Sequence, residues 1–317
     1  MNMKLPFSKT LVTGGAGFIG SHLVDELVGR GCSVTVLDDL SSGHLRNLEK
    51  VSSRITLIRA DIRDPDAVMR AAEGCQAVFH QAAVVSVTKT VEDPLGSAHV
   101  NEMGTLNVLE AARRNGIVRV VLASSSAVYG DDPQLPKTEA MTPVPLSPYA
   151  VQKLTNEHHA RLYHRLYGVE TACLRYFNVF GPRQDPASPY SGVISIFMTR
   201  ASRNLAPLIY GDGRQTRDFV FVGDVVKANL LAACRADAAG EVFNIGTGRS
   251  VSINALWQSI AQAGGCRAAA EYRDPRPGDI VHSLADIQKA RQTIGFEPSV
   301  QLEAGLQLTY GWYRQEV

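Results

Sequence analysis

The first half of the chain alternates short apolar runs with longer segments in which apolar residues recur every three or four positions. The short runs are rich in branched residues and predict strands at Thr10–Thr13, Ser33–Leu37, Ile55–Arg59, Ala77–His80, Val118–Ala123 and Thr171–Arg175. The periodic segments predict helices at Phe18–Arg30, Pro65–Ala72, Leu95–Asn115 and Pro148–Tyr167. We therefore expect an α/β fold with a doubly wound, Rossmann-like parallel sheet covered by helices on both faces.

This alternation stops after Tyr176, and Asn178–Gly192 is rich in Gly, Pro, Asp and Ser, which predicts a long loop. Further elements are expected at Val193–Asn204, Leu208–Tyr210, Asp218–Val222, Val225–Arg235, Glu241–Asn244, Ile253–Ala263, Leu284–Thr293 and Leu302–Tyr313. Their mixture predicts a smaller mixed α/β lobe at the carboxyl edge of the sheet, where doubly wound folds bind ligands. We divide the chain into a domain at residues 1–177 and a ligand-binding lobe at residues 178–317, partly interleaved with the first.

The composition narrows the classes of partner. The formal net charge is +1 and no basic tract is present, so we expect no nucleic-acid partner. No apolar stretch approaches the ~20 residues that span a bilayer, and no signal peptide is apparent, so we expect no membrane association. The five cysteines form no C-x-x-C pair, which argues against a zinc site or a disulfide framework. We expect no metal and a cytoplasmic location.

The segment between the first predicted strand and the first predicted helix contains Gly14, Gly17 and Gly20. In a dinucleotide-binding turn these glycines permit the tight turn, the close approach of a pyrophosphate and the packing of helix on strand. The helix N-terminus then offers free N–H groups to phosphate. Asp38 ends the second strand about 20 residues further on, where a carboxylate accepts ribose hydroxyls and repels a 2′-phosphate. The pattern predicts NAD rather than NADP, with a cap or turn role for Asp38 as the alternative.

Two residues after the third strand extend this prediction. Asp61 and Ile62 are placed to flank the adenine, although Asp61 is almost equally well explained as a turn residue.

A tyrosine and a lysine lie one turn apart on the helix that begins at Pro148. Tyr149 and Lys153 share one helical face, and an ammonium close to a phenol is expected to lower the phenol pKa. The fifth strand ends in Ser124, Ser125 and Ser126, whose hydroxyls can bond a substrate oxygen at the carboxyl edge or satisfy turn backbone.

These motifs together resemble the extended short-chain dehydrogenase/reductase family. The glycine loop, the serine strand end through Gly130, Tyr149-x-x-x-Lys153 and Arg175–Gly181 all fit that family, and the resemblance covers essentially the whole chain. It is strongest to the bacterial UDP-N-acetylglucosamine 4-epimerases, close relatives of the UDP-galactose 4-epimerases.

The resemblance implies the chemistry. In these epimerases a tyrosinate takes the 4′-hydroxyl proton, a hydride passes to NAD, and the 4-keto sugar turns and receives the hydride on its opposite face. By resemblance Tyr149 is the base, Lys153 its tuner and Ser125 the proton-sharing hydroxyl, with Ser124 as the alternative.

The resemblance also implies which residues bind each ligand. The cofactor-binding residues are Gly14, Gly17, Phe18, Ile19, Gly20, Asp38, Asp61, Ile62, Gln81, Ala82, Ala83, Asn101, Tyr149, Lys153 and Tyr176. The residues expected at the UDP-sugar are Ser86, Ser124, Ser125, Asn178, Val193, Leu208, Tyr210, Arg217, Arg276, Asp279 and Ser283. Leu208 and Tyr210 would bracket uracil, and the two arginines suit a diphosphate because each can bind it bidentately. Arg183 and Gln184 lie in the loop over the sugar and could contact it.

The residues directly after Ser125 indicate the branch of the reaction. Dehydratases of this family place an Asp-Glu pair directly after the catalytic Ser or Thr, whereas this chain has Ser126-Ala127, which favours oxidation and re-reduction at carbon 4. A UDP-glucuronate epimerase or decarboxylase and a galactose-only epimerase remain open. A non-catalytic NAD-binding protein is disfavoured because both Tyr149 and Lys153 are present.

Two positions favour acetylated sugars. Ser283 stands where epimerases limited to plain sugars carry a bulky tyrosine, so it leaves room for an N-acetyl group. Val85 stands near a position where galactose-type enzymes have a lysine by the NAD phosphates, and the acetylated-sugar branch also lacks that lysine. We therefore expect UDP-GlcNAc and UDP-GalNAc, with UDP-Glc and UDP-Gal as secondary substrates. The resemblance also implies a homodimer through the helices Leu95–Asn115 and Pro148–Tyr167.

Overall fold

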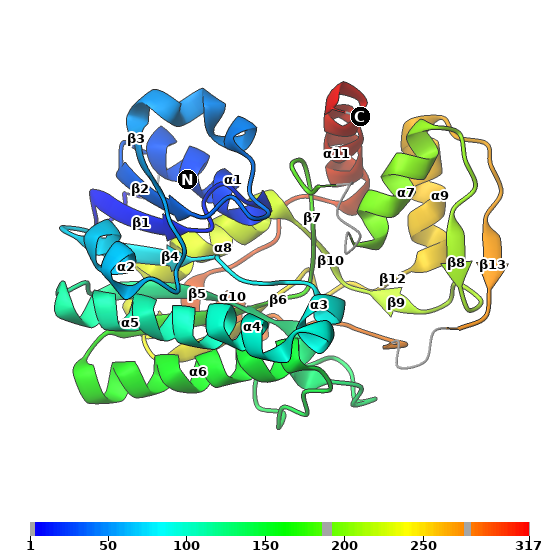
Figure 1. The fold of residues 1–317 in the computed structure, drawn as a ribbon. Helices are drawn as coiled ribbons and strands as arrows, with labels where there is room; N and C mark the ends of the chain where they lie inside the picture. Colours follow the sequence, from blue (N-terminus) through cyan, green and yellow to red (C-terminus); the bar gives the residue numbers. More distant parts are fainter. Residues whose placement is uncertain (1–3, 186–191, 276–279, 317) are drawn as a thin grey trace.

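The computed structural model describes residues 4–185, 192–275 and 280–316. Its centre is a parallel sheet with the strand order β11-β6-β5-β4-β1-β2-β3 (Figure 1). The strands are β1 (Lys9–Thr13), β2 (Ser33–Asp38), β3 (Ile55–Arg59), β4 (Ala77–His80), β5 (Arg119–Ser125), β6 (Glu170–Tyr176) and β11 (Glu241–Ile245). The order reverses between β1 and β4, so the predicted doubly wound Rossmann-like fold is confirmed.

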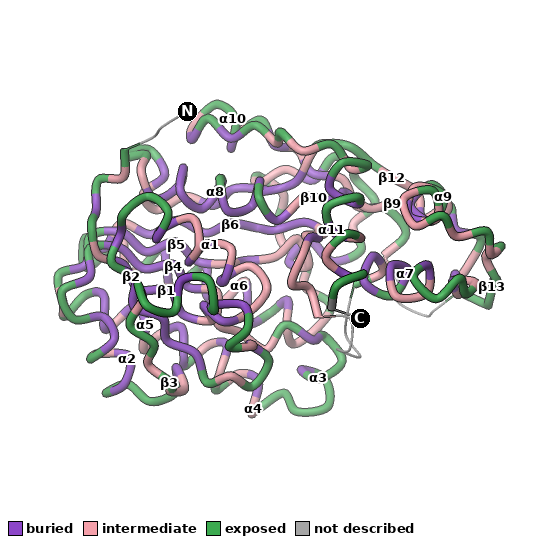
Figure 2. Tube along the Cα trace, turned by 90° about the horizontal axis from the view of Figure 1, so that it is seen from above, coloured by how far each residue is buried: buried purple, intermediate pink, exposed green. Residues whose placement is uncertain are grey.

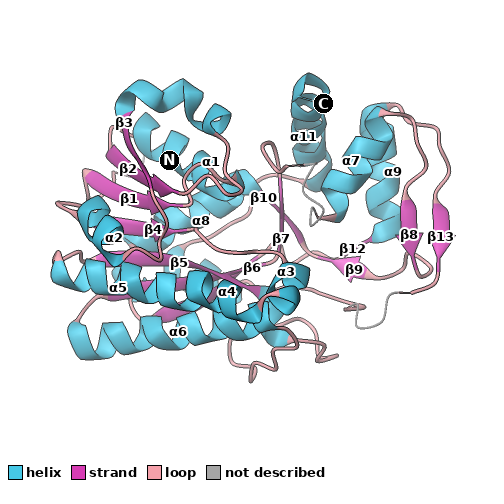
Figure 3. Ribbon diagram, in the orientation of Figure 1, coloured by secondary structure: helices cyan, strands magenta, loops and turns pink. Residues whose placement is uncertain are grey.

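Helices cover both faces of this sheet, and Figure 3 shows them as layers on either side of the strands. One face carries α1 (Phe18–Gly29), a 3₁₀ segment at Leu45–Arg54, α8 (Val222–Cys234) and α10 (Gln288–Ile294). The other carries α2 (Pro65–Ala72), α5 (Gly104–Arg114) and α6 (Pro148–Tyr167). Both layers bury aliphatic side chains against the strands, and Figure 2 shows the buried residues gathered around the sheet. Burial of this apolar surface stabilises the sheet at roughly 25 cal/mol per Å².

The helix α6 has clear start and stop signals in the sequence. Ser147 caps it by accepting a hydrogen bond from the Ala150 N–H at 3.2 Å, and Pro148 occupies its first position. Gly168, with φ of 71°, ends it in the left-handed conformation. Its boundaries agree with the prediction, and they place Tyr149 in the first turn at the carboxyl edge of the sheet.

The predicted helix Leu95–Asn115 is interrupted. Its run starts as α4 (Pro94–Ala98), widens into a π-helical turn at His99–Met103 and continues as α5. Asn101 lies inside the widened turn, and its carbonyl oxygen accepts hydrogen bonds from the Thr105 hydroxyl and the Asn156 amide. A π turn inserts one extra residue without ending the helix, so the hydrophobic period alone could not reveal it.

The chain after Tyr176 contributes to both lobes. The segment Glu241–Asn244, which the sequence placed in the C-terminal lobe, belongs to β11 and pairs with β6 as the seventh strand of the main sheet. The helices α8 and α10 also pack on that sheet. A division between residues 177 and 178 therefore fits the structure only if β11, α8 and α10 are counted with the first domain. Periodicity identifies a strand but not its partner, so the sequence predicted interleaving without showing which strand returns to the main sheet.

The C-terminal lobe contains α7 (Val193–Ser202), α9 (Ile253–Gly264) and α11 (Leu302–Glu316) around their own apolar cluster. Two-stranded pairs form separate small sheets: β7 (Asn178–Phe180) with β10 (Phe219–Phe221), β9 (Thr216–Arg217) with β12 (Val251–Ser252), and β8 (Leu208–Tyr210) with β13 (Glu271–Arg273). The short elements β7, β9, β12, β13 and α3 (Val87–Glu92) were missed because two to six residues carry little periodicity. None of the helices in the described ranges combines the length and apolar character that a bilayer crossing requires.

Candidate active site

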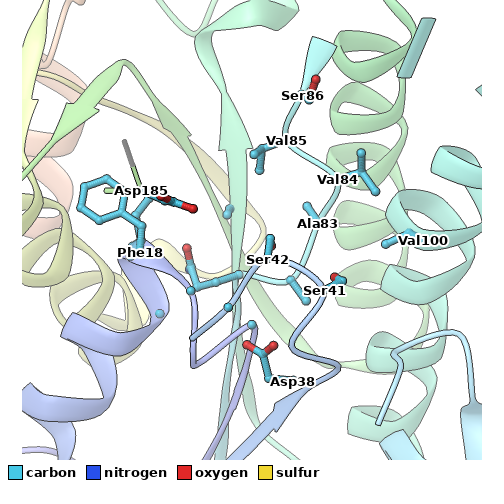
Figure 4. A pocket seen from close by; sticks show the side chains of 18 of the residues that line it. Phe18, Asp38, Ser41, Ser42, Ala83, Val84, Val85, Ser86, Val100 and Asp185 are labelled. Carbon is cyan, nitrogen blue, oxygen red and sulfur yellow. The ribbon is translucent and has the colours of Figure 1, made fainter. Parts of the chain in front are cut away.

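A cavity of about 820 Å³ lies at the carboxyl ends of the central strands. Most of the predicted ligand-binding residues line it: Gly14, Gly17, Phe18, Ile19, Gly20, Asp38, Asp61, Ile62, Gln81, Ala82, Ala83, Ser86, Ser124, Ser125, Tyr149, Lys153, Tyr176 and Asn178. Figure 4 shows Asp38 near Ser41 and Ser42 in one part of it, with the segment Ala83–Ser86 along another. The fold therefore assembles these distant segments around a single cavity.

The glycine loop is packed too tightly for any side chain. A Cβ on Gly14, whose φ is +67°, would lie 2.7 Å from the Ala82 nitrogen, and one on Gly20 would lie 2.1 Å from the Gly14 oxygen. The N-cap residue of α1 is Gly17, so no side chain caps this helix, and its first turn contains no acidic residue. The first N–H groups of α1 are therefore available to a phosphate at the helix N-terminus.

Asp38 lies at the end of β2 inside the cavity wall. One carboxylate oxygen accepts the Ala16 N–H at 2.8 Å and the other accepts the Leu40 N–H at 2.9 Å. Burial raises the pKa of this carboxyl, while both backbone hydrogen bonds oppose the shift. Each oxygen retains a lone pair, so the carboxylate can still accept ribose hydroxyls.

Asp61 and Ile62 follow β3 and occupy another part of the wall. The Arg63 guanidinium binds Asp61 through Nε at 2.9 Å and Nη2 at 2.6 Å, and these hydrogen bonds lower the pKa of Asp61. Asp61 thus behaves as a turn residue that also borders the cavity. The buried side chain of Ile62 is the better placed of the two to contact an apolar ring.

Tyr149, Ser125 and Lys153 lie together. The side chains of Tyr149 and Ser125 both line the cavity, where Ser125 acts to lower the pKa of the Tyr149 phenol, and the Lys153 ammonium is 5.8 Å from the centroid of the Tyr149 ring. Lys153 donates to the Ala123 carbonyl at 2.8 Å, which ties α6 to β5 two residues before Ser125. The arrangement provides a phenol, a hydroxyl that can share its proton, and a fixed cation beside them.

The expected acidification of Tyr149 by Lys153 is not what the structure shows. Burial raises the pKa of Tyr149, and the opposing influence is its hydrogen bond with Ser125. Lys153 is itself buried, and burial lowers its pKa to about 8. Both groups leave water together, so desolvation outweighs the attraction of the ammonium for a phenolate.

The two candidate serines have different partners. Ser124 donates to Glu157 Oε1 at 2.5 Å and is buried, so its hydroxyl proton is already committed. Ser125 accepts the Ala127 N–H at 3.2 Å and faces Tyr149. Ser125 is the last residue of β5 and lies near the first turn of α6, whereas Ser124, one residue earlier, bonds Glu157 two turns further along the same helix.

Tyr176 and Gln81 are joined by a residue that the sequence did not suggest. The Asn229 side chain on α8 donates to the Tyr176 hydroxyl at 2.8 Å, and Gln81 donates to that same hydroxyl at 3.2 Å. Asn229 is fully buried and lies outside every motif, so only the folded chain could identify it.

Asn101, predicted near the cofactor, is not among the residues that line the described cavity. Its side chain accepts the Val84 N–H at 2.7 Å and donates to the Val84 carbonyl at 3.0 Å. These two hydrogen bonds fix the backbone of Val84, and so the segment Ala83–Ser86 that lines the cavity. The π turn directs the side chain toward that segment, and the sequence contained no sign of it.

Several predicted substrate residues lie beyond the walls of this cavity, on the C-terminal lobe: Val193, Leu208, Tyr210, Arg217 and Ser283. Ser283 is adjacent to the strand that carries Arg217, because its N–H donates to the Thr216 carbonyl at 3.1 Å. Val193 begins α7 directly after Gly192, which does line the cavity. The predicted residues Arg276 and Asp279 lie outside the described residues.

The cavity also includes residues that the motifs did not indicate. The loop after β2 supplies Ser41, Ser42 and His44, and the His44 imidazole lies 3.4 Å from the Asp185 carboxylate across the cavity mouth. Arg183, proposed as a possible sugar contact, lines the wall but forms an ion pair with Asp25 of α1 at 2.6 Å. The run of small and polar residues Ser41–His44, shortly after Asp38, is the sequence feature that could have predicted this part of the cavity wall.

The described residues fit a bound dinucleotide. The glycine cradle excludes side chains, the α1 N-terminus is uncapped, and Asp38 stands at the end of the adjacent strand. In the same described ranges, His, Cys, Asp and Glu side chains form no group of three that could hold a metal ion. Together with the Tyr-Lys-Ser arrangement, these features define a dinucleotide-dependent enzyme of the short-chain dehydrogenase type.

The chain belongs to the NAD dependent epimerase/dehydratase family, whose model matches residues 10–246. A putative UDP-glucose 4-epimerase from Methanocaldococcus jannaschii is 44% identical over 306 residues, which cover 96% of this chain and 98% of that protein. A UDP-N-acetylglucosamine 4-epimerase from Methanobrevibacter ruminantium, solved with UDP-N-acetylmuramic acid, superimposes with a TM-score of 0.94 at 40% identity over 99% of this chain and 100% of the other.

The UDP-glucose 4-epimerase of Thermus thermophilus, solved with NAD, gives a TM-score of 0.89 at 39% identity, covering 98% of this chain and 100% of that one. The predicted resemblance to the extended short-chain family and the predicted cofactor are both confirmed, and the protein is an NAD-dependent enzyme.

The glycine cradle yields a prediction about cofactor binding. Gly20→Ala should lower the thermal midpoint and weaken NAD binding at least tenfold, because its Cβ would overlap backbone atoms of Gly14. Gly29→Ala on the same helix meets nothing within 4 Å and should leave both unchanged or raise stability slightly. Calorimetric titration with NAD and thermal melts compare the two variants. Equal behaviour of the pair would contradict the assigned role of the cradle.

Proposed function

We propose that the protein interconverts UDP-N-acetylglucosamine and UDP-N-acetylgalactosamine at carbon 4, with UDP-glucose and UDP-galactose as secondary substrates. At the level of the reaction it is an NAD-dependent UDP-sugar 4-epimerase, as its family and its relatives indicate. The identity of the sugar is the proposal. The observation that carries the reaction is the grouping of Tyr149, Ser125 and Lys153 in the wall of one cavity, with the Lys153 ammonium beside the Tyr149 ring.

Three side chains of the site serve the transfer of one proton, that of the 4′-hydroxyl of the sugar. Tyr149 removes the proton of the 4′-hydroxyl, and Ser125 holds the same oxygen through its hydroxyl. Lys153 stays charged beside the phenol and favours its ionised form. When bound, NAD would supply a positive charge and the acceptor and donor of the hydride at carbon 4, so that no net NADH is expected. The dinucleotide charge would offset the burial that raises the pKa of Tyr149.

The positions of the carboxylates in the cavity wall argue against a dehydration reaction. The carboxylates on the described walls are Asp38, Asp39, Asp61 and Asp185. Asp38 and Asp39 lie at the end of β2 and Asp61 follows β3, so these three are on the other side of β1 from β5. Asp185 faces His44. Elimination of water needs a further acid or base beside the tyrosine, and the position after Ser126 is an alanine.

The nucleotide is proposed to extend onto the C-terminal lobe. Asn178 starts β7 in the cavity wall and would meet the diphosphate together with Arg217 and Arg276, while Asp279 would accept ribose hydroxyls. Leu208 and Tyr210 lie on the same side of β8, since alternate residues of a strand share a face, and would bracket the uracil. Ser86 and Val193 complete the proposed sugar-binding set, whereas Ser124, which the resemblance also placed there, lines the wall with its hydroxyl proton donated to Glu157.

The proposed activity has a direct test. Purified protein incubated with UDP-GlcNAc should form UDP-GalNAc without net NADH, and Tyr149→Phe should lower kcat by about 10³-fold because the proton acceptor is lost. Chromatographic separation of the 4-epimers, with absorbance at 340 nm for NADH, measures both. Parallel incubation with UDP-glucuronate detects the uronate alternative. Absence of turnover on every UDP-hexose would refute the proposal.

The substrate proposal has its own test at Ser283. Ser283→Tyr should reduce kcat/KM on UDP-GlcNAc about tenfold or more, while the value on UDP-galactose changes by less than about threefold, because the ring would occupy the space of the N-acetyl group. Val281→Tyr adds the same ring two residues away, at a side chain that is 59% exposed, and should change neither value. Undiminished activity of Ser283→Tyr on UDP-GlcNAc and UDP-GalNAc would contradict the proposed role of Ser283 in admitting the N-acetyl group.

We also propose a homodimer through α5 and α6. Apolar side chains stand exposed on these helices and the turn before α5, among them Met103, Leu162 and Leu166. Burying such a face against a second copy would stabilise the pair. Met103→Glu with Leu162→Glu should convert a dimer into a monomer in sedimentation equilibrium, whereas Leu308→Glu, equally exposed on α11, should not. A wild-type monomer at micromolar concentration would contradict this.

A further inference from the structure

A buried network of charged side chains lies next to the Tyr149–Lys153 pair, and the proposed proton transfer does not use it. Glu157 follows Lys153 by one turn of α6, so Tyr149, Lys153 and Glu157 succeed one another along one helical face. Lys153 and Glu157 are each 5% exposed. An acidic side chain at such depth requires specific partners.

Glu157 has those partners on two strands. Arg175 of β6 binds it in a bidentate manner, with Nε at 2.8 Å from Oε1 and Nη2 at 2.7 Å from Oε2. Ser124, which is the register partner of Arg175 on β5, donates to the same Oε1. A bidentate pair fixes the plane of the carboxylate as well as its position. The residue that precedes Ser125 is thereby tied to α6 one turn beyond Lys153.

The network continues across the sheet. The Arg175 guanidinium carbon lies 4.8 Å from the centroid of the Tyr129 ring, and the Tyr129 hydroxyl donates to Asn244 Oδ1 at 2.7 Å. Asn244 is the register partner of Arg175 on β11. The contacts therefore run from α6 through β5 and β6 to β11, and they hold the end of β5 from both sides.

Fold stability is a weak explanation for this ion pair. Desolvation of two charges nearly cancels their attraction, and apolar substitutes for buried pairs are often neutral or stabilising. The groups facing Lys153 suggest another role. Tyr149 and Glu157 face it from its own helix, Cys173 from β6 and His80 from β4, with Arg175 beyond Glu157. Burial raises the pKa of Cys173 and lowers that of His80 to about 3, so both are neutral near pH 7.

We propose that Glu157 is a positioning residue for the epimerisation, acting through two neighbours. Its carboxylate, held by Arg175, keeps the Lys153 ammonium charged in a buried place, and its hydrogen bond with Ser124 holds the end of β5 so that Ser125 faces Tyr149. Glu157 does not line the described cavity and therefore touches neither ligand there. The inference rests on the proposed function, because Lys153 and Ser125 carry the chemistry in that proposal.

The decisive variant is Glu157→Gln, which preserves the shape of the side chain and removes its charge. Without that charge the pKa of Lys153, already lowered to about 8 by burial, should fall by about one unit. The alkaline limb of the kcat–pH profile should move to lower pH by the same amount. Glu157→Asp keeps the charge and should keep the wild-type limb. Ser124→Ala should lower kcat about tenfold at every pH without moving the limb.

A matched control exists at the other end of the same two strands. Arg119 of β5 and Glu170 of β6 are register partners joined by an ion pair of 2.6 Å. Glu170→Gln should lower the thermal midpoint and leave the alkaline limb where it is. A purely structural role for Glu157 predicts the same outcome for both substitutions.

A readout independent of turnover completes the test. NMR titration of Lys153 in protein labelled with ¹³C-lysine, assigned through Lys153→Met, should show the downward shift in Glu157→Gln and none in Glu170→Gln. Identical Lys153 titration in wild type and Glu157→Gln overturns the inference. Should Glu157→Gln not fold, Glu157→Gln with Arg175→Met removes both charges and must show a shift in the same direction. Inability of the wild type to epimerise a UDP-hexose refutes the proposed function instead, and the titration still decides the role of Glu157.

Discussion

The structure depends on burying polar and charged groups at the carboxyl edge of a parallel sheet. Tyr149, Lys153, Glu157 and Arg175 all lie where β5 and β6 meet α6, and three of them carry charge with very little exposure. Parallel strands end together, so βαβ connections bring these side chains to one edge. Water is excluded there, which strengthens each electrostatic contact and makes every unpaired charge costly.

This burial explains why the proposed proton transfer needs several side chains and not Tyr149 alone. Tyr149 alone becomes harder to ionise in the cavity wall, and Lys153 becomes harder to keep charged. The hydroxyl of Ser125 and the carboxylate of Glu157 each oppose one of these shifts. The positive charge of an oxidised dinucleotide would act in the same direction on the phenol. In the proposed mechanism, binding of the cofactor would therefore favour ionisation of the tyrosine.

The two lobes divide binding and chemistry unequally. The glycine cradle and Asp38 form one end of the cavity, where a Cβ added to Gly14 or Gly20 would overlap neighbouring backbone atoms. The proposed nucleotide contacts Leu208, Tyr210 and Arg217 lie on two- and three-residue strands of the C-terminal lobe. Because β11 and α8 return from that part of the chain into the first sheet, movement of the lobes is restrained by shared elements. Differences in sugar preference can therefore arise in the second lobe without disturbing the first.

The sequence alone determined the strands β1 to β6, the glycine loop, Asp38 and the Tyr149–Lys153 spacing, because local periodicity and fixed offsets carry that information. It could not place β11 in the main sheet, widen the helix at Asn101 or distinguish Ser124 from Ser125, since each depends on a partner distant in the chain. Asn229 and Glu157 belong to no motif, and only packing brings them to the site, Asn229 beside Tyr176 and Glu157 beside Arg175. The direction of the Tyr149 pKa shift was also decided by tertiary structure, because spacing along a helix shows which charge is near and not how much water has been lost.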